Sequence, residues 1–287
     1  MDRRRFLVAG LGLSVVGILG SSLMIPETSI AQAPAASATA DNVRKARIFI
    51  TGSSEGLGKL AAQTLLADGY RVVVHVRSPA RLSAVQELVN KGAVATIGDL
   101  SDLTQTRDLA AQVNKIGPMD AVIHNAGVYT GPAILTVNVV APYLLTALIQ
   151  RPKRLIYLSS GMHSGGRASL SGMDWTGKTA TGSYSDSKLF VTTLAAAVAR
   201  MWPDIYSNSV NPGWVPTKMG GSSAPDDLRL GHLTQEWLAT SNDAEAQTSG
   251  GYWFHQKREK PHAAVLDVQF QTQLLDELAR ATGTALS

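Results

Sequence analysis

The chain has 287 residues, of which 45% are hydrophobic and 17% are charged, so neither whole-chain disorder nor a coiled coil is expected. It contains no cysteine, which excludes disulfides, thiolate metal sites and thiol nucleophiles. The formal net charge of +4 is small and is not gathered into long runs of Lys and Arg, so we do not expect nucleic-acid binding. The length by itself allows one domain or two.

Residues 1–33 have the pattern of an export signal. Arg3, Arg4 and Arg5 stand before an apolar run that is diluted by glycines and continues to residue 25. Residues 31–33 (Ala-Gln-Ala) then give a small-x-small cleavage site. The paired arginines resemble a twin-arginine (Tat) signal, which predicts the Tat translocon as a partner and a periplasmic or other extracytoplasmic location.

An uncleaved membrane anchor is the alternative for this segment, because about 20 apolar residues can span a bilayer. Both interpretations leave the arginines inside and the rest of the chain outside the cytoplasmic membrane. Residues 34–43 are small and polar and are expected to form a flexible lead-in. The folded part of the chain is therefore expected over residues 44–287, as one domain.

From residue 44 onward, short apolar runs alternate with longer segments of helical spacing. Runs of five to seven residues rich in Val and Ile are typical of strands buried on both faces. Their alternation with helices predicts βαβ units and a doubly wound parallel sheet in a three-layer α/β/α arrangement. Strands are expected at 46–51, 70–76, 93–98, 119–125, 154–160 and 205–210, and helices at 57–68, 79–91, 102–115, 133–150 and 183–201.

The tail after residue 213 is less regular. Residues 220–225 are rich in Gly and Ser and predict a loop. Helices are expected at 228–239 and 263–281, and a short edge strand at 250–255.

A glycine-rich turn follows the first predicted strand. Thr51 and Gly52 are followed by Gly56 and Gly58, at the point where the strand ends and a helix begins. Gly52 would permit a tight turn, Gly56 a close approach to a pyrophosphate, and Gly58 the packing of helix on strand. Amides of the first helical turn would face the phosphates. Such a turn can also simply end a strand, but its place in a βαβ series favours a dinucleotide site.

The end of the second predicted strand bears on the choice of cofactor. It carries Arg77 and no carboxylate. An Asp or Glu there is typical of NAD sites, whereas an arginine suits the 2′-phosphate of NADP. The sequence therefore favours NADP over NAD, with an ordinary solvated arginine as the alternative.

Tyr184 and Lys188 lie four residues apart at the start of a predicted helix, and so on one helical face. A nearby ammonium is expected to lower the pKa of the phenol, toward the range in which it can exchange a proton with a substrate. The pair alone could equally be an ordinary surface pair. Ser159 and Ser160 end one predicted strand and Asn125 ends another, so these polar groups should meet at one edge of the sheet.

These motifs together resemble those of the short-chain dehydrogenase/reductase family, a single-domain Rossmann type, over about residues 44–217. The blocks 159–163 and 184–189 look most like its retinol-dehydrogenase-like branch. The resemblance implies that Tyr184, Lys188, Ser160 and Asn138 are catalytic, with Ser159 as the alternative to Ser160. It implies cofactor contacts from Gly52, Ser53, Ser54, Gly56, Leu57, Gly58, Arg77, Asp99, Leu100, Asn125, Ala126, Gly127, Tyr184, Lys188, Pro212, Gly213 and Thr217.

The resemblance further implies an NAD(P)-dependent oxidoreductase that transfers a hydride between nicotinamide and a hydrophobic carbonyl or alcohol. Tyr184 would exchange the proton, Lys188 would hold the nicotinamide ribose, Ser160 would orient the carbonyl oxygen and Asn138 would place a water. A homodimer or homotetramer is expected, with a substrate loop within residues 213–251. The segment 162–182 is longer than in many members and is expected to cap the substrate.

A non-catalytic NADP-binding or interaction protein on the same fold is the main alternative, because a fold does not fix a function. An epimerase or dehydratase that retains its cofactor is a third interpretation. The sequence contains no cluster with metal-ligand spacing, and Ser160 lacks the G-x-S-x-G elbow of serine hydrolases. The lone histidines His163 and His255 are not expected to be catalytic or to bind a metal.

Overall fold

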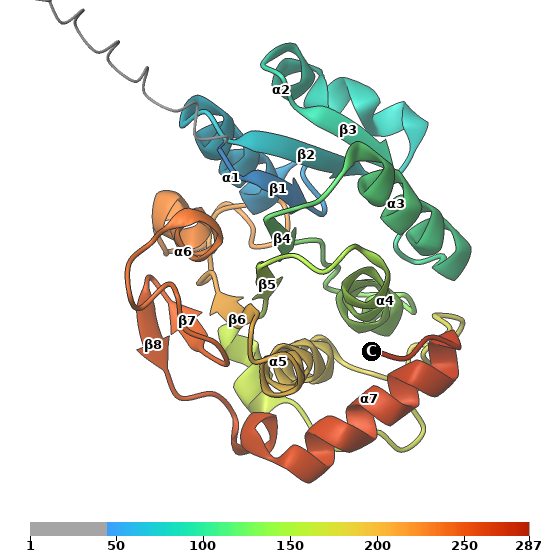
Figure 1. Ribbon diagram of the computed structural model, residues 1–287. Helices are drawn as coiled ribbons and strands as arrows, with labels where there is room; N and C mark the ends of the chain where they lie inside the picture. Colours follow the sequence, from blue (N-terminus) through green and yellow to red (C-terminus); the bar gives the residue numbers. More distant parts are fainter. Residues whose placement is uncertain (1–44, 287) are drawn as a thin grey trace, which may run out of the picture. The chain divides into compact units, whose positions relative to one another are not determined.

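The computed structural model describes residues 45–286, so the predicted signal and lead-in lie outside the described residues. Eight strands form one sheet in the order β3-β2-β1-β4-β5-β6-β7-β8, and every neighbouring pair is parallel except β7 and β8 (Figure 1). The strands are β1 Arg47–Ile50, β2 Arg71–Val76, β3 Val94–Ile97, β4 Ala121–His124, β5 Arg154–Leu158, β6 Tyr206–Asn211, β7 Tyr252–Phe254 and β8 Lys257–Glu259.

The central strands are buried on both faces, as their continuous apolar runs predict. In β1, Ile48, Phe49 and Ile50 are all fully buried. Phe49 points into one hydrophobic core, while Ile48 and Ile50 point into the other, because successive side chains leave a strand on opposite sides. The sheet thus separates two cores, each of which needs a layer of helices.

Helices cover both faces of the sheet, and the predicted doubly wound α/β/α fold is confirmed (Figure 1). One layer contains α1 (Gly56–Ala67), α2 (Gln86–Asn90) and α6 (Leu228–Thr240), and the other contains α3 (Leu103–Ile116), α4 (Ala141–Leu148), α5 (Tyr184–Met201) and α7 (Val268–Thr282). None of the helices within residues 45–286 has both the length and the apolar character needed to cross a bilayer.

Two of the predicted helices are not α-helical throughout. The segment expected at 79–91 begins as a 3-10 helix, Pro79–Val85, before α2. The segment expected at 133–150 contains a π-helical turn, Thr136–Val140, before α4. Pro142 explains the second departure, because it has no N–H to donate to the carbonyl of Asn138 four residues earlier.

The strand predicted at 250–255 is present as β7, but its expected position at the sheet edge was wrong. The edge is β8, which pairs antiparallel with β7 through a tight turn at His255 and Gln256. Both turn residues have positive φ, 48° and 61°. His-Gln is not one of the Asn-Gly or Asp-Gly pairs that announce such a hairpin in a sequence, so the turn could not be foreseen.

The C-terminal helix α7 lies along α5 (Figure 1). Its residues Phe270, Leu274 and Leu278 are buried in the same core as Phe190 of α5. Beyond the helix, the carbonyl of Thr284 accepts a hydrogen bond of 2.8 Å from the Tyr143 hydroxyl of α4. The last described residues therefore fasten the end of the chain onto two neighbouring helices.

Candidate active site

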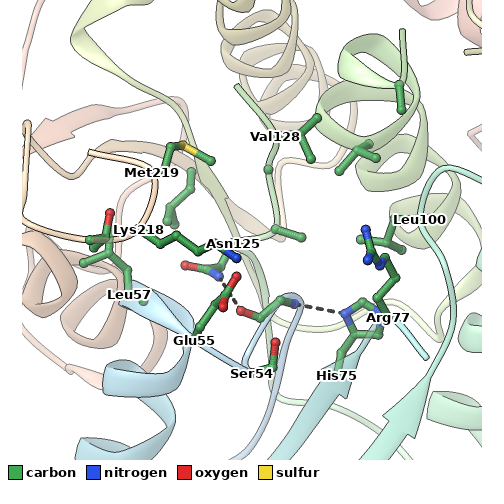
Figure 2. Close-up of a pocket in the computed structure, with 18 of the residues that line it drawn as sticks. Ser54, Glu55, Leu57, His75, Arg77, Leu100, Asn125, Val128, Lys218 and Met219 are labelled. Carbon is green, nitrogen blue, oxygen red and sulfur yellow. Dashed lines mark hydrogen bonds between the residues drawn. The ribbon is translucent and has the colours of Figure 1, made fainter. Parts of the chain in front are cut away.

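A cavity of about 450 Å³ opens at the carboxyl ends of β1, β2, β4 and β5 (Figure 2). The strand order reverses between β1 and β4, and such switch points are where open α/β sheets bind ligands. Its size lies within the range of small-molecule sites. It is lined by Gly52, Ser54, Glu55, Gly56, Leu57, His75, Arg77, Arg81, Asp99, Leu100, Ser101, Asn125, Ala126, Gly127, Val128, Ala133, Val137, Leu158, Ser159, Tyr184, Lys188, Pro212, Thr217, Lys218 and Met219.

The glycine turn needs its glycines for steric reasons that the structure makes explicit. Gly52 has φ +66°, and a Cβ there would lie 2.9 Å from the Cα of Ala126. A Cβ on Gly58 would lie 2.3 Å from the side-chain nitrogen of Asn125. That amide donates hydrogen bonds to the carbonyls of Thr51 and Gly52, at 2.9 and 3.2 Å (Figure 2). Asn125 thus fixes the turn rather than pointing into the cavity with a free amide.

His75 braces the same turn from β2. Its Nδ1 accepts a hydrogen bond of 3.0 Å from the amide of Gly52, and its Nε2 donates one of 2.8 Å to the carbonyl of Gly98 (Figure 2). Burial lowers the pKa of His75 to about 4, so the ring is neutral at pH 7. The Ser53 hydroxyl is fully buried, donates to the carbonyl of Ile50 and accepts from the amide of His75.

Charged side chains gather at the end of the cavity next to β2 and β3. Arg77 is exposed, and Asp99 accepts hydrogen bonds from the backbone and hydroxyl of Ser101. Arg81 was not predicted as a site residue. Its guanidinium lies 3.0 Å from a carboxylate oxygen of Glu55 and 3.4 Å from the hydroxyl of Ser54. Two arginines and a glutamate therefore line this end of the cavity.

Tyr184 and Lys188 lie at the other end of the cavity. The α5 helix that carries them begins with a capping box, in which the side chains of Ser183 and Asp186 each bond the other's backbone amide. The Lys188 ammonium donates a hydrogen bond of 2.7 Å to the carbonyl of Leu158 and lies 5.5 Å from the centre of the Tyr184 ring. The Ser160 side chain lies beside that of Tyr184 and acts to lower the pKa of the phenol.

The structure distinguishes between the two serines at the end of β5. The Ser159 hydroxyl is buried and bonds the Thr192 hydroxyl at 2.5 Å. The Ser160 hydroxyl, in contrast, accepts from the Met162 amide and meets Tyr184. Ser160 is therefore the serine placed beside the tyrosine.

Burial dominates the electrostatics of this pair. It lowers the pKa of Lys188 to about 8 and raises the pKa of Tyr184 to about 12. The expectation that Lys188 lowers the pKa of the phenol was wrong for this structure. The ammonium is turned toward the Leu158 carbonyl, and the hydrogen bond from Ser160 offsets only part of the desolvation.

Asn138 lies in the π-helical turn and is fully engaged through its side chain. Its Oδ1 accepts from the Val128 amide at 2.8 Å, and its Nδ2 donates to the Val128 carbonyl at 2.9 Å and to the Ser187 hydroxyl at 3.0 Å. The side chain links the bend after β4 to α5. A Cβ on Gly127 in that bend would touch both Asn138 and Lys188, at 3.4 and 3.5 Å.

The loop after β6 reaches back over the glycine turn. Gly213 has φ +84°, and a Cβ there would lie 2.6 Å from a carboxylate oxygen of Asp226. That carboxylate accepts from the Trp214 amide. Thr217 lies opposite Gly56, whose added Cβ would be 3.8 Å away. Pro212, Thr217, Lys218 and Met219 consequently form one wall of the cavity.

Large apolar side chains are exposed in the loops at the carboxyl end of the sheet. Tyr129, Met162, Trp214 and Met219, here called the apolar rim, are 45–57% exposed and lie in the loops that follow β4, β5 and β6. The ring of Tyr129 lies 4.7 Å from that of Tyr184. Exposed apolar groups gathered at one place commonly mark a binding surface.

The prediction that segment 162–182 caps the substrate was wrong for most of its length. Arg167 bonds Asp186 at 2.7 Å, and Trp175 is buried beside Phe190. Residues 168–173 face α7, and no residue of 162–182 lines the cavity. These side chains are held by α5 and α7, and only Met162 remains at the apolar rim.

The cavity brings together most of the predicted site residues, but not all. Five predicted residues do not line it: Ser53, Gly58, Asn138, Ser160 and Gly213. The first four contact residues that line the cavity, and the Gly213 amide bonds the side chain of Asn211 nearby. His75, Arg81, Glu55 and Lys218 line it without having been predicted. Within residues 45–286, no group of three or more His, Asp and Glu side chains is arranged to hold a metal ion.

Comparisons with known proteins agree with this geometry. The short chain dehydrogenase family model matches residues 46–154. A blue fluorescent protein from a metagenomic library, solved in complex with NADPH, shares the fold with a TM-score of 0.61 and 23% identity, over 74% of this chain and 97% of its own. Retinol dehydrogenase 13 of Mus musculus is 25% identical over 99% of this chain and 96% of its length.

A stronger sequence match comes from an uncharacterized oxidoreductase of Emericella nidulans. It is 38% identical to this chain over 255 residues, which cover 84% of this chain and 98% of the relative. Identity at this level across nearly a whole relative, together with the glycine turn and the Tyr184–Lys188 pair, shows that the chain belongs to the short-chain dehydrogenase/reductase family of oxidoreductases.

Proposed function

We propose that this protein is an NADP(H)-dependent oxidoreductase that interconverts an apolar carbonyl compound and its alcohol. The observation that carries the proposal is the placement of Tyr184. Its side chain lies beside those of Ser160 and Lys188, at one end of a cavity whose other end is the glycine turn with Arg77 and Arg81.

The cavity fits a dinucleotide. Gly52 and Gly56, both with positive φ, line it with bare backbone, and the Glu55 side chain makes no capping bond to the first turn of α1. Arg77 and Arg81 offer guanidinium groups to a 2′-phosphate, which favours NADP over NAD. When bound, such a cofactor supplies or accepts the hydride.

The chain's own residues would manage the proton and the carbonyl oxygen. The Tyr184 hydroxyl would donate a proton to that oxygen in reduction, or accept one in oxidation, and Ser160 would orient the oxygen by a second hydrogen bond. The Lys188 ammonium would hold ribose hydroxyls, and its charge would make the phenol easier to ionise once it turns from Leu158.

Asn138 would serve as a positioning residue. Both hydrogens of its amide are used by Val128 and Ser187, so its side chain has no donor left for a water. Its backbone carbonyl cannot bond the nitrogen of Pro142, which frees that oxygen from α-helical pairing. We propose that the water of the proton relay is held there.

The apolar rim supports a hydrophobic substrate, since its side chains are exposed and the Tyr129 ring lies 4.7 Å from that of Tyr184. The match to a retinol dehydrogenase supports assignment to that branch of the family.

The decisive experiment compares the protein with its Tyr184→Phe variant, using NADPH and a series of aldehydes and ketones. Loss of the proton donor should lower kcat by at least about 100-fold while leaving NADPH binding unchanged. Turnover by Tyr184→Phe at the rate of the unaltered protein would refute the proposed chemistry. Nucleotide binding without turnover of any substrate by the unaltered protein would favour the alternative, a non-catalytic NADP-binding protein.

We further propose Tat-dependent export, with the protein folding around its cofactor before translocation. The twin arginines at Arg3 and Arg4 support this, and replacing both with lysines should retain the protein in the cytoplasm. Self-association into a homodimer or homotetramer is proposed from the family resemblance alone, and sedimentation of the purified protein tests it.

A further inference from the structure

The backbone carbonyl of Ser160 receives an unusual number of hydrogen bonds. The His163 amide donates to it at 3.1 Å and the His163 ring nitrogen Nδ1 at 2.9 Å. The Tyr252 hydroxyl of β7 donates at 3.2 Å. Because a carbonyl oxygen has two lone pairs, this one is saturated, and the residue that carries it is fixed from both sides.

The protonation state of His163 follows from its partners. Its Nε2 accepts a hydrogen bond of 3.0 Å from the backbone amide of His262, so the proton must be on Nδ1, the atom that faces Ser160. The ring also packs on Tyr252, with the two centres 4.4 Å apart. His163 is 3% exposed, so solvent does not compete for either nitrogen.

We propose that His163, in its neutral Nδ1–H form and together with Tyr252, is a positioning residue that holds Ser160 in register with Tyr184. The inference rests on the proposed function, since it assigns a purpose to the Ser160–Tyr184 contact. It also connects the segment from β7 to residue 262 with the reacting end of the cavity. Neither His163 nor Tyr252 lines that cavity.

The arrangement makes the position of Ser160 sensitive to acid. If Nε2 of His163 were protonated, it could no longer accept a hydrogen bond from the His262 amide, because both atoms would then be donors. The contact between them would break. The titratable groups that face the ring are the Tyr252 phenol and the His262 imidazole. Burial and Glu259 raise the pKa of Tyr252, so the phenol keeps its proton. Burial lowers the pKa of His163, which places the sensitive range below pH 6.5.

The test measures kcat and KM against pH for the unaltered protein and four variants. His163→Leu should lower kcat about 10- to 100-fold at all pH values with KM within twofold, because misplacing a reacting group costs rate rather than binding. His163→Asn keeps a donor toward Ser160 and should recover most of kcat, but without the decline below pH 6.5. Tyr252→Phe, which removes one donor, should lower kcat about fivefold.

Two matched controls complete the series. Ser164→Ala lies in the same turn but bonds only the Gly161 carbonyl, and should behave as the unaltered protein. His262→Asn keeps a capping side chain at that position and should retain the acid decline. If His262→Asn abolishes the decline, or if His163→Leu keeps the unaltered kcat, the positioning role is refuted. If Tyr184→Phe keeps its turnover, the proposed function fails instead.

A measurement without turnover tests the same geometry. Nitrogen-15 NMR of the histidine rings of the full protein at pH 7 should show the His163 signal, identified by its loss in His163→Asn, as a neutral Nδ1–H tautomer. An Nε2–H tautomer would overturn the proposal even if His163→Leu failed to fold.

Discussion

The Nδ1 atom of His75 lies 3.0 Å from the amide nitrogen of Gly52, and this contact joins the second strand to the turn that follows the first. With Nε2 donating to the Gly98 carbonyl, one imidazole on β2 ties together the two segments that follow β1 and β3. The glycine turn is therefore not held by its own sequence alone. Its shape depends on a neutral histidine 23 residues away.

Replacing His75 by phenylalanine should disturb both stability and nucleotide binding. The ring is kept, but the Gly52 amide and Gly98 carbonyl lose their partner, at a cost of about 1–3 kcal/mol for each buried group. We expect NADPH affinity to fall at least about tenfold in a fluorescence titration. His124→Phe is the matched control, because His124 is equally buried but bonds Thr146 away from the cavity. Unchanged NADPH affinity in His75→Phe would contradict the bracing role.

The stability of the protein should fall as the pH drops below 6.5. Burial lowers the pKa of His75 to about 4 and that of His124 to about 3. The unfolded chain takes up these protons near pH 6.5 while the folded protein does not, so acid favours unfolding. Each histidine contributes up to about 1.4 kcal/mol per pH unit in this window. Urea unfolding between pH 7 and 5 measures the pH dependence of the free energy of unfolding. That dependence should be shallower in His124→Gln. A free energy of unfolding that does not change with pH would argue against neutral buried rings.

Nucleotide affinity should weaken as the pH rises through about 8. Burial lowers the pKa of Lys188 to about 8, so the ammonium that would hold the ribose is lost above that value. The NADPH dissociation constant should rise by up to about tenfold per pH unit between pH 8 and 9.5. Lys218→Met, another lysine of the cavity, should keep this dependence, whereas Lys188→Met should remove it.

The ion pair between Glu55 and Arg81 should tune cofactor preference. The two side chains lie 3.0 Å apart and both are partly exposed, so the pair itself stabilises the fold by at most about 1 kcal/mol. Glu55→Gln releases Arg81 for a 2′-phosphate and should raise the NADPH-to-NADH preference about fivefold. Arg81→Met should lower it by about tenfold or more. Equal preference in Arg81→Met and the unaltered protein would assign the discrimination to Arg77 alone.

Removing the Asp186 carboxylate should loosen the start of α5. It caps the helix through the Ser183 amide and pairs with Arg167, and it is 1% exposed. Asp186→Ala should reduce the free energy of unfolding by about 2–4 kcal/mol. Asp174→Ala, which removes a less buried carboxylate from the loop before α5, should cost less. Comparable losses in the two variants would contradict the special place of Asp186.

Much of the fold was predictable because the sheet is buried on both faces. Continuous runs of Val and Ile such as Val72–Val74 are typical of strands buried on both faces. The six strands and their alternation with helices therefore follow from the pattern alone. The glycine turn and the Tyr184–Lys188 spacing were predictable for a different reason. They are local, and each depends on residues within one turn or one helix.

What could not be predicted depends on contacts between distant residues. Arg81 and His75 enter the cavity because β2 and the turn after β1 are neighbours, and nothing in their local sequence shows it. The pKa of Tyr184 moved opposite to expectation because the fold buries the phenol, while the Lys188 ammonium bonds the Leu158 carbonyl. The segment 162–182 lies against α5 and α7, and α7 is about a hundred residues further on.

The docking of α7 has a consequence for how the protein is made. The core on that face of the sheet contains Phe49 near the start of the described residues and Leu278 near their end. Until the last helix has left the ribosome, Phe190 and its apolar neighbours on α5 lack the cover that Phe270 and Leu274 provide. Folding of this face is thus completed only after α7 has emerged, and a chain terminated before α7 should expose an apolar surface that quality-control proteases can recognise.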